Sequence, residues 1–236
     1  MRLDKFLVEN RIGSRSQVKD YIKKGMVQVN DITAKKPEEK IDEHKDKIAF
    51  QGKMICYEKY VYFMLHKPAG VITATEDKVD QTVMDLLPQE YKKDCFPVGR
   101  LDKDTEGLLL ITNNGELAHQ LLSPKKHVEK QYFVRTNGVM TEKMIQQLEA
   151  GVDICDDKLT APAKAELLKS DEEVSELLLT ITEGRFHQVK RMIHVCGQEV
   201  TYLKRLSMGS LCLDPELEKG SFRQLTEQEI EALTIR

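Results

Sequence analysis

The sequence predicts an α+β protein of two domains, in which a small N-terminal domain precedes a larger one built on a largely antiparallel, mixed sheet flanked by helices. In the larger part, segments typical of strands do not alternate regularly with helical segments, which argues against a doubly wound parallel sheet. The 236 residues fit between one and two domains of about 150 residues each. Residues 51–58 show no hydrophobic period, so we place the first domain at 1–55 and the second at 59–236.

The N-terminal domain is expected to contain two helices followed by a short β element. Apolar residues at 3, 6 and 7 have helical spacing, and Gly13 should end this first helix. Ser14 can cap the second helix, and Gln17 stands three residues later as its capping-box partner. The buried face of that helix holds residues 18, 21 and 22, and the opposite face carries basic side chains at 15, 19 and 23. Val27 and Val29 then alternate with polar neighbours, as in a strand.

The larger domain can be divided into elements by the same patterns. Apolar runs of strand length occur at the start of the domain and again before the Asn-Asn-Gly turn at 113–115. Segments with the amphipathic spacing of helices lie between several of the later strand segments. The expected strands are 61–65, 71–73, 108–112, 132–134 and 177–182, and the expected helices are 83–87, 116–122, 141–150, 186–196 and a last one beginning at 226.

The charge of the chain is unevenly distributed. The formal net charge is −3, which by itself speaks against a nucleic-acid partner. Residues 1–36, however, carry nine basic and four acidic side chains, and residues 184–205 carry five basic and one acidic. A polyanion responds to charge within about 8 Å in physiological salt, so two basic segments fit a local RNA or DNA contact. Charge alone is equally compatible with an ordinary solvated surface.

Composition excludes several classes of protein. No apolar stretch reaches the roughly 18 residues of a membrane span, and no hydrophobic signal core follows Met1, so we expect a cytoplasmic protein without a membrane partner. The five cysteines form no Cys-x-x-Cys pair, which argues against a zinc ribbon or a disulfide framework. His187 and His194 are seven residues apart without a third ligand at suitable spacing, so we predict no metal site.

The most unusual stretch is the charged loop from Gly99 to Gly107. It contains three acidic residues, two basic residues and a threonine, and it leads directly into an apolar strand. Catalytic groups are often held in a loop at the mouth of a rigid strand. Taken alone, the same residues fit a charged surface turn.

Several ordered motifs resemble known families. The segments Arg2–Leu7, Ser14-Arg15 and Gly25–Asn30 resemble the S4 RNA-binding domain over residues 1–48. The loop Gly-Arg-Leu-Asp-x-Asp-Thr-x-Gly-Leu-Leu resembles the signature of the pseudouridine synthases, in their RsuA-type branch. Three further motifs match in order: Lys67-Pro68-x-Gly70, Glu129-Lys130-x-Tyr132 and Glu183–Met192. Together these motifs cover nearly the whole chain and imply an S4-like domain followed by a pseudouridine synthase domain.

The resemblance implies roles for particular residues. Asp102 matches the catalytic aspartate, Tyr132 the tyrosine that stacks on the target base, and Arg185 the basic residue paired with the aspartate. Arg100 is expected to support the site or contact RNA. The further residues expected to bind RNA are Lys190 and Arg191 near the site, and Arg2, Lys5, Arg15 and Lys19 on the S4-like domain.

The chemistry agrees with these residue types. Converting uridine to pseudouridine cuts the N1–C1′ bond and joins C5 to C1′, and it adds and removes no group, so no cofactor is expected. A carboxylate in a closed site tends to become neutral unless a cation lies close to it, and a guanidinium is always charged. The target base must leave its stack at a cost of a few kcal/mol, of which aromatic stacking recovers about 1–3 kcal/mol.

Similarity to enzymes of the small ribosomal subunit implies that the partner is ribosomal RNA or an assembling small subunit, bound by a monomer. Three alternatives stay open. They are an enzyme of large-subunit RNA, a non-catalytic S4-domain protein of RNA binding or ribosome assembly, and a hydrolase that uses Asp102 and Glu106 as an acid–base pair.

Overall fold

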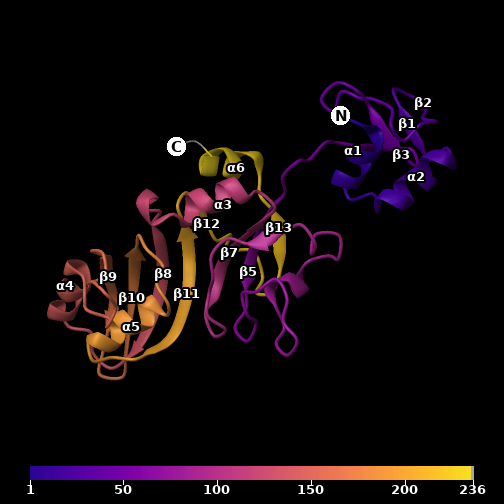
Figure 1. The fold of residues 1–236 in the computed structure, drawn as a ribbon. Helices are drawn as coiled ribbons and strands as arrows, with labels where there is room; N and C mark the ends of the chain where they lie inside the picture. Colours follow the sequence, from indigo (N-terminus) through magenta and orange to yellow (C-terminus); the bar gives the residue numbers. More distant parts are fainter. Residues whose placement is uncertain (235–236) are drawn as a thin grey trace. The chain divides into compact units, whose positions relative to one another are not determined.

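The structure is a computed structural model that describes residues 1–234, and it divides into two compact units between Val61 and Tyr62 (Figure 1). Each unit combines helices with a sheet, so the predicted α+β class is confirmed. Within the described residues, none of the helices has the length and apolar character needed to span a bilayer.

The first unit packs two helices on a four-stranded antiparallel sheet of order β2-β1-β3-β4. The Ser14 hydroxyl accepts a hydrogen bond from the Gln17 amide, and the Gln17 side chain accepts one from the Ser14 amide, which confirms the predicted capping box. Apolar side chains of both helices and of β1 and β3 form one core. The elements are α1 (Leu3–Glu9), α2 (Arg15–Lys23), β1 (Val27–Val29), β2 (Ile32–Thr33), β3 (Ile48–Phe50) and β4 (Lys53–Ile55).

The second unit is built on a nine-stranded sheet of order β13-β5-β7-β11-β8-β10-β9, with β12 beside β11 and β6 beside β7. The β7–β11 pair is parallel and the other pairs are antiparallel, so the sheet is mixed as predicted. The strands are β5 (Tyr62–Lys67), β6 (Phe96–Pro97), β7 (Glu106–Thr112), β8 (Lys130–Asn137), β9 (Lys164–Ser170), β10 (Val174–Ile181), β11 (Val200–Met208), β12 (Leu211–Cys212) and β13 (Phe222–Gln224).

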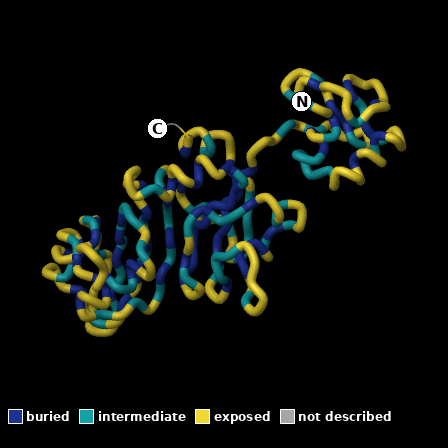
Figure 2. The backbone as a smooth tube through the Cα atoms, in the orientation of Figure 1, coloured by how far each residue is buried: buried dark blue, intermediate teal, exposed yellow. Residues whose placement is uncertain are grey.

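The helices of this unit cover the sheet in two groups, each over its own core. One core joins α4 and α5 to β8, β10 and β11, and the other joins α3 and α6 to β5 and β7. Figure 2 shows the strands largely buried and the outer faces of the helices exposed. The helices are η1 (Val83–Leu86, a 3-10 turn), α3 (Gly115–Leu122), η2 (Pro124–Lys126, also 3-10), α4 (Glu142–Ala150), α5 (Gln188–Val195) and α6 (Glu227–Thr234).

Several elements differ from the sequence expectation, and β9 and β13 are among the strands that were not predicted. The predicted strand 71–73 is a single bridge between Ile72 and Thr82, because no neighbouring strand runs beside it for longer. The predicted helix 83–87 is one 3-10 turn. β11 was missed because lysine and arginine at 204 and 205 interrupt its apolar pattern, although the strand lies in the middle of the sheet.

Candidate active site

The charged loop between β6 and β7 is held in place by a buried lysine. Lys67, at the end of β5, is fully buried, and its Nζ donates to the main-chain oxygens of Asp102 (3.0 Å), Lys103 (3.3 Å) and Thr105 (2.8 Å). Burial lowers the pKa of Lys67 to about 8, although the nearby carboxylates oppose this effect. One ammonium group therefore organises the turn that carries Asp102.

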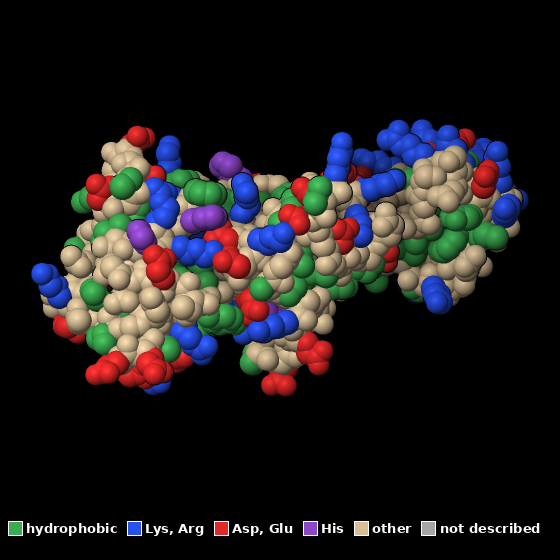
Figure 3. All heavy atoms as spheres, turned by 90° about the horizontal axis from the view of Figure 1, so that it is seen from below, with side chains coloured by type: hydrophobic (Ala, Val, Ile, Leu, Met, Phe, Trp, Pro, Cys, Tyr) green, Lys and Arg blue, Asp and Glu red, His purple; other side chains and the backbone are tan. Residues whose placement is uncertain are grey.

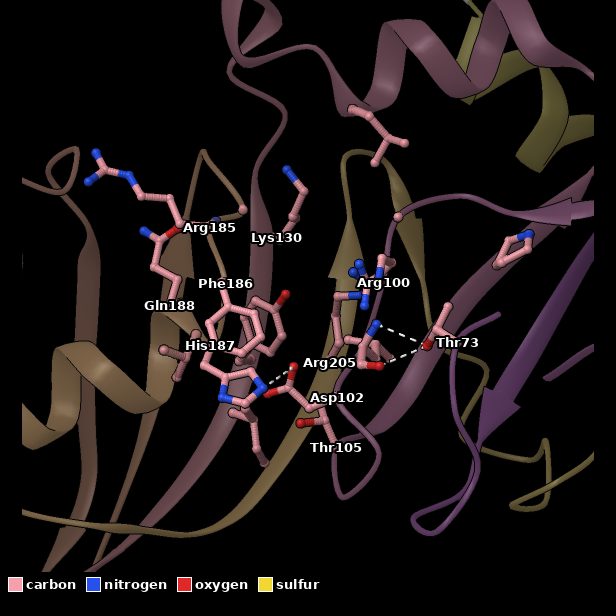
Figure 4. Close-up of a pocket in the computed structure, with 18 of the residues that line it drawn as sticks. Thr73, Arg100, Asp102, Thr105, Lys130, Arg185, Phe186, His187, Gln188 and Arg205 are labelled. Carbon is pink, nitrogen blue, oxygen red and sulfur yellow. Dashed lines mark hydrogen bonds and ion pairs between the residues drawn. The ribbon is translucent and has the colours of Figure 1, made fainter. Parts of the chain in front are cut away.

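Two further contacts fix the start and the end of this loop. The Thr73 hydroxyl donates to the Leu101 oxygen (2.8 Å) and accepts from the Leu101 amide (3.1 Å), as dashed lines mark in Figure 4. At the other end, Gly107 has φ +107°, and an added Cβ would lie 2.2 Å from the main-chain oxygen of Arg205. Only glycine therefore lets β7 leave the loop and approach β11 this closely.

The loop borders a cavity of about 1060 Å³ that lies within the second unit. This is the size of a large ligand-binding pocket. Five of the predicted site residues line it: Arg100, Asp102, Tyr132, Arg185 and Lys190. Tyr132 projects from β8 and is 7% exposed, so its ring forms part of the buried wall.

Two basic side chains from the start of α5 lie beside Asp102. Lys190 Nζ is 3.2 Å from the Asp102 carboxylate. His187 Nε2 is 3.5 Å from the same carboxylate, as a dashed line marks in Figure 4. Lys190 also contacts Asp104 at 2.5 Å. Burial opposes the charge of Lys190, but its bonds to Asp104 and Asp102 outweigh this effect and raise its pKa. A carboxylate beside a lysine and a histidine, in a cavity that an aromatic ring also lines, suits acid–base or nucleophilic chemistry on a planar substrate.

The expectation that Arg185 pairs with Asp102 is wrong. Its guanidinium points away from Asp102 in Figure 4 and donates to the main-chain oxygens of Lys158 and Leu159, both at 2.7 Å. It also forms an ion pair with Glu183 at 3.1 Å. The fork of guanidinium donors matches these two carbonyls and the carboxylate, so Arg185 connects the segment before α5 to the loop at 158–159. Lys190, in the first turn of α5, contacts Asp102 instead.

The remaining predicted residues lie elsewhere. Arg191 is not among the residues that line the cavity, and it pairs with Asp156 at 2.7 Å. Arg2, Lys5, Arg15 and Lys19 belong to the first unit and are all exposed. In Figure 3 this unit is at the right, and lysine and arginine side chains gather along one edge of it.

Glu106 does not form an acid–base pair with Asp102 at this cavity. Its carboxylate contacts Tyr202 Oη (2.6 Å) and Lys219 Nζ (2.7 Å), and the residue does not line the cavity. The hydrolase alternative has no support in this geometry.

Sequence reasoning missed the roles of four side chains at the site. Lys67, Lys130 and His187 stand inside recognised motifs, and the motifs were the signal that could have identified them. Arg205 had no such signal, since only the pairing of β11 with β8 and β7 brings it to the cavity.

Comparison with known families identifies both units. Residues 61–195 match the family described as RNA pseudouridylate synthase, and residues 1–48 match the S4 domain. A solved structure described as "Crystal structure of pseudouridylate synthase" superposes with a TM-score of 0.70 at 36% sequence identity, and the match covers 99% of this chain and 100% of that one.

Curated relatives match over the full length. An uncharacterized RNA pseudouridine synthase of Bacillus subtilis (strain 168) is 49% identical, covering 99% of this chain and 98% of the relative. Ribosomal small subunit pseudouridine synthase A of Vibrio cholerae is 38% identical, covering 99% of each chain. Ribosomal large subunit pseudouridine synthase B of Bacillus subtilis (strain 168) is also 38% identical, covering 98% of this chain and 95% of the relative.

Proposed function

Because this chain belongs to the RNA pseudouridylate synthase family, whose members are isomerases, we propose that it converts one uridine of ribosomal RNA to pseudouridine, with small-subunit RNA as the substrate. The surroundings of Asp102 carry the proposal. The carboxylate stands at a cavity that also holds Tyr132, and Lys190 and His187 flank it.

Each of these side chains has a task in the isomerisation. A uridine turned out of its RNA places its base on the Tyr132 ring, which repays part of the cost of unstacking. Asp102 then acts on the sugar or the base, either by nucleophilic attack or by taking a proton from the sugar. The N1–C1′ bond breaks and the C5–C1′ bond forms, C5 loses its proton, and N1 gains one, so the composition of the nucleotide does not change. Lys190 supplies the positive charge beside the carboxylate.

The first unit supports RNA as the substrate. Arg15 and Lys19 are exposed on α2, and neither has a carboxylate within 4 Å among residues 1–234. Side chains of this kind bind phosphates and position a protein on structured RNA without reading its bases. By contrast, Arg2 is already paired with Asp4 at 2.7 Å, and Lys5 with Glu9 at 3.5 Å.

Small-subunit RNA is our first choice of substrate because Met1–Leu7 and Thr182–Arg185 resemble the motifs of enzymes of that subunit. Large-subunit RNA is the second candidate. The relatives named for the two subunits are equally identical to this chain, at 38% each. Overall identity therefore does not discriminate between the two RNAs, and only a direct assay can.

The test compares wild type, Asp102→Asn and Asp104→Asn on unmodified RNA of each subunit, with pseudouridine mapped by a base-specific carbodiimide label. Asp104 is the matched control, because it lies in the same loop and also contacts Lys190. We expect one labelled position in small-subunit RNA with wild type, a weaker signal with Asp104→Asn and none with Asp102→Asn. All three proteins should bind RNA equally.

Two results would change the conclusion. Labelling of large-subunit RNA alone would transfer the activity to that substrate. RNA binding by wild type without any labelled position would favour the non-catalytic S4-domain protein.

A further inference from the structure

Two buried cations line the cavity without a counter-ion. Lys130 at the start of β8 is 8% exposed, and Arg205 on β11 is 1% exposed. Both line the cavity that holds Asp102. Neither has a carboxylate within 4 Å among residues 1–234, whereas Arg185 is paired with Glu183 and Lys190 with Asp102 and Asp104.

Their hydrogen bonds leave donors unused. Lys130 Nζ donates to the Val128 oxygen at 2.9 Å, and Arg205 Nε donates to the Leu108 oxygen at 2.8 Å. Arg205 Nη2 is buried and has no hydrogen-bond partner. Buried donors are almost always paired in folded proteins. An unpaired guanidinium nitrogen at a cavity therefore indicates that a bound ligand supplies its hydrogen-bond acceptor.

The same two side chains lie next to the aromatic wall. Arg205 is directly opposite Tyr132 in the antiparallel β8–β11 pair, and Lys130 lies two residues before Tyr132 on the same face of β8. All three are therefore reached from the interior of the cavity, beyond the exposed Arg100 at its edge. Figure 4 shows Lys130 and Arg205 on neighbouring strands at this cavity.

Burying two positive charges next to each other costs free energy when no anion neutralises them. Burial, followed by the charge of Arg205, lowers the pKa of Lys130 to about 8. Free-energy costs of this kind are tolerated mainly at functional sites. In a cavity with little water, fixed positive charge strongly stabilises negative charge that develops only during the reaction.

We propose that Lys130 and Arg205 form an anion-stabilising floor that holds the negative charge of the uracil during isomerisation. This inference rests on the proposed function and extends it. When the N1–C1′ bond breaks, its electron pair stays on the uracil, and the charge is shared by N1, O2 and O4. When C5 attacks C1′, the pair returns to the sugar, C5 loses its proton and N1 gains one. Lys130 and Arg205 donate to the uracil oxygens throughout and give up no proton.

The uracil is favoured over the other anionic group of the substrate, its phosphate. The two cations lie on the same face of the sheet as Tyr132, on whose ring the base is proposed to stack. Phosphates are expected nearer the edge of the cavity, where the exposed Arg100 lies. The common chemistry is an anionic oxygen, so the experiment has to separate the two sources.

The first measurement is the single-turnover rate of Lys130→Met, with Lys130→Arg to restore the charge and Lys164→Met as the control. Lys164 is an exposed lysine of the neighbouring sheet edge, paired with Glu129 and outside the cavity. We expect Lys130→Met to lose roughly 10²–10³-fold in rate, the loss of one donor to a developing anion, with its RNA affinity unchanged. Lys130→Arg should recover part of the rate, and Lys164→Met should match wild type. A wild-type rate in Lys130→Met would overturn the proposal.

The second measurement identifies the anion. In RNA with 5-fluorouridine at the target position, fluorine stabilises the uracil anion, so the deficit of Lys130→Met in consuming the target nucleotide should shrink at least tenfold. A neutral methylphosphonate beside the target should leave the deficit unchanged. If the methylphosphonate removes the deficit and fluorine does not, the floor binds phosphate and the proposal is wrong.

A third readout needs no turnover and therefore separates this inference from the proposed function. Binding of free 5-fluorouracil, followed by fluorine NMR across the pH range in which it ionises, should favour the anion with wild type and lose that preference with Lys130→Met. Equal binding of anion and neutral base by wild type would refute the floor, even if pseudouridine is formed.

Discussion

Gly107→Ala would place a methyl group inside the backbone of a neighbouring strand. The added Cβ would lie 2.2 Å from the main-chain oxygen of Arg205 and 2.6 Å from its nitrogen, at a φ of +107°. Gly107 is the second residue of β7 and pairs with Arg205 in the parallel β7–β11 contact. This contact joins the two halves of the sheet, because β5 and β7 pack in one core, β8 and β10 pack in the other, and β11 contributes to both.

The magnitude follows from two additive costs. A left-handed backbone costs an L-residue roughly 1–2 kcal/mol, and overpacking against a backbone that must move costs roughly 1–3 kcal/mol. Gly107→Ala should therefore lower the free energy of unfolding of the second unit by roughly 2–5 kcal/mol, a large part of the 5–15 kcal/mol typical of a domain. Gly220→Ala isolates the first cost, since Gly220 has φ +83° with nothing within 4 Å of an added Cβ.

The assay is urea unfolding followed by circular dichroism, with pseudouridine formation measured in parallel. We expect Gly220→Ala to lose only the roughly 1–2 kcal/mol of unfolding free energy that the left-handed backbone costs, and to keep its activity. Gly107→Ala should lose more stability and most activity, because Asp102 lies only five residues before the substituted position. Equal unfolding free energies in the two variants would refute the steric argument.

Three other predictions concern lysines and arginines of both units. Lys67→Met leaves the carbonyls of the Asp102 loop without their donor, which should cost about 1–3 kcal/mol of unfolding free energy and most of the activity; an unchanged thermal midpoint and rate would contradict this role. Arg15→Ala and Lys19→Ala should each reduce the slope of log RNA affinity against log salt by about 1, and equal slopes would remove this docking face. Lys130 has a pKa of about 8 when folded and an ordinary value of 10.5, so between these pH values the folded state binds fewer protons, and the stability of wild type relative to Lys130→Met should rise by about 3 kcal/mol with increasing pH. A flat difference in urea unfolding across this range would count against a buried charge.

Local patterns were sufficient for much of the fold. The Ser14 capping box, the strand before the Asn-Asn-Gly turn and helix α4 depend on neighbours a few residues apart, and the structure contains all three. Residues 71–73 have the composition of a strand but no long partner, and β11 has a partner on each side but charged residues within it. Pairing between distant segments decides such cases, and composition does not report it.

The site divides in the same way. The motifs alone pointed to Asp102 and Tyr132, because their residue types and order suit the chemistry. Which cation faces Asp102 was decided only by tertiary structure. Arg185 and Lys190 are both basic and lie five residues apart, but the turn into α5 directs Arg185 to the carbonyls of 158 and 159 and Lys190 to Asp102. Arg205 reaches the cavity only through the pairing of β11. Sequence determines which charges are available, and the packing of distant segments determines which of them meet, because ion pairs act over a few ångströms of space irrespective of separation along the chain.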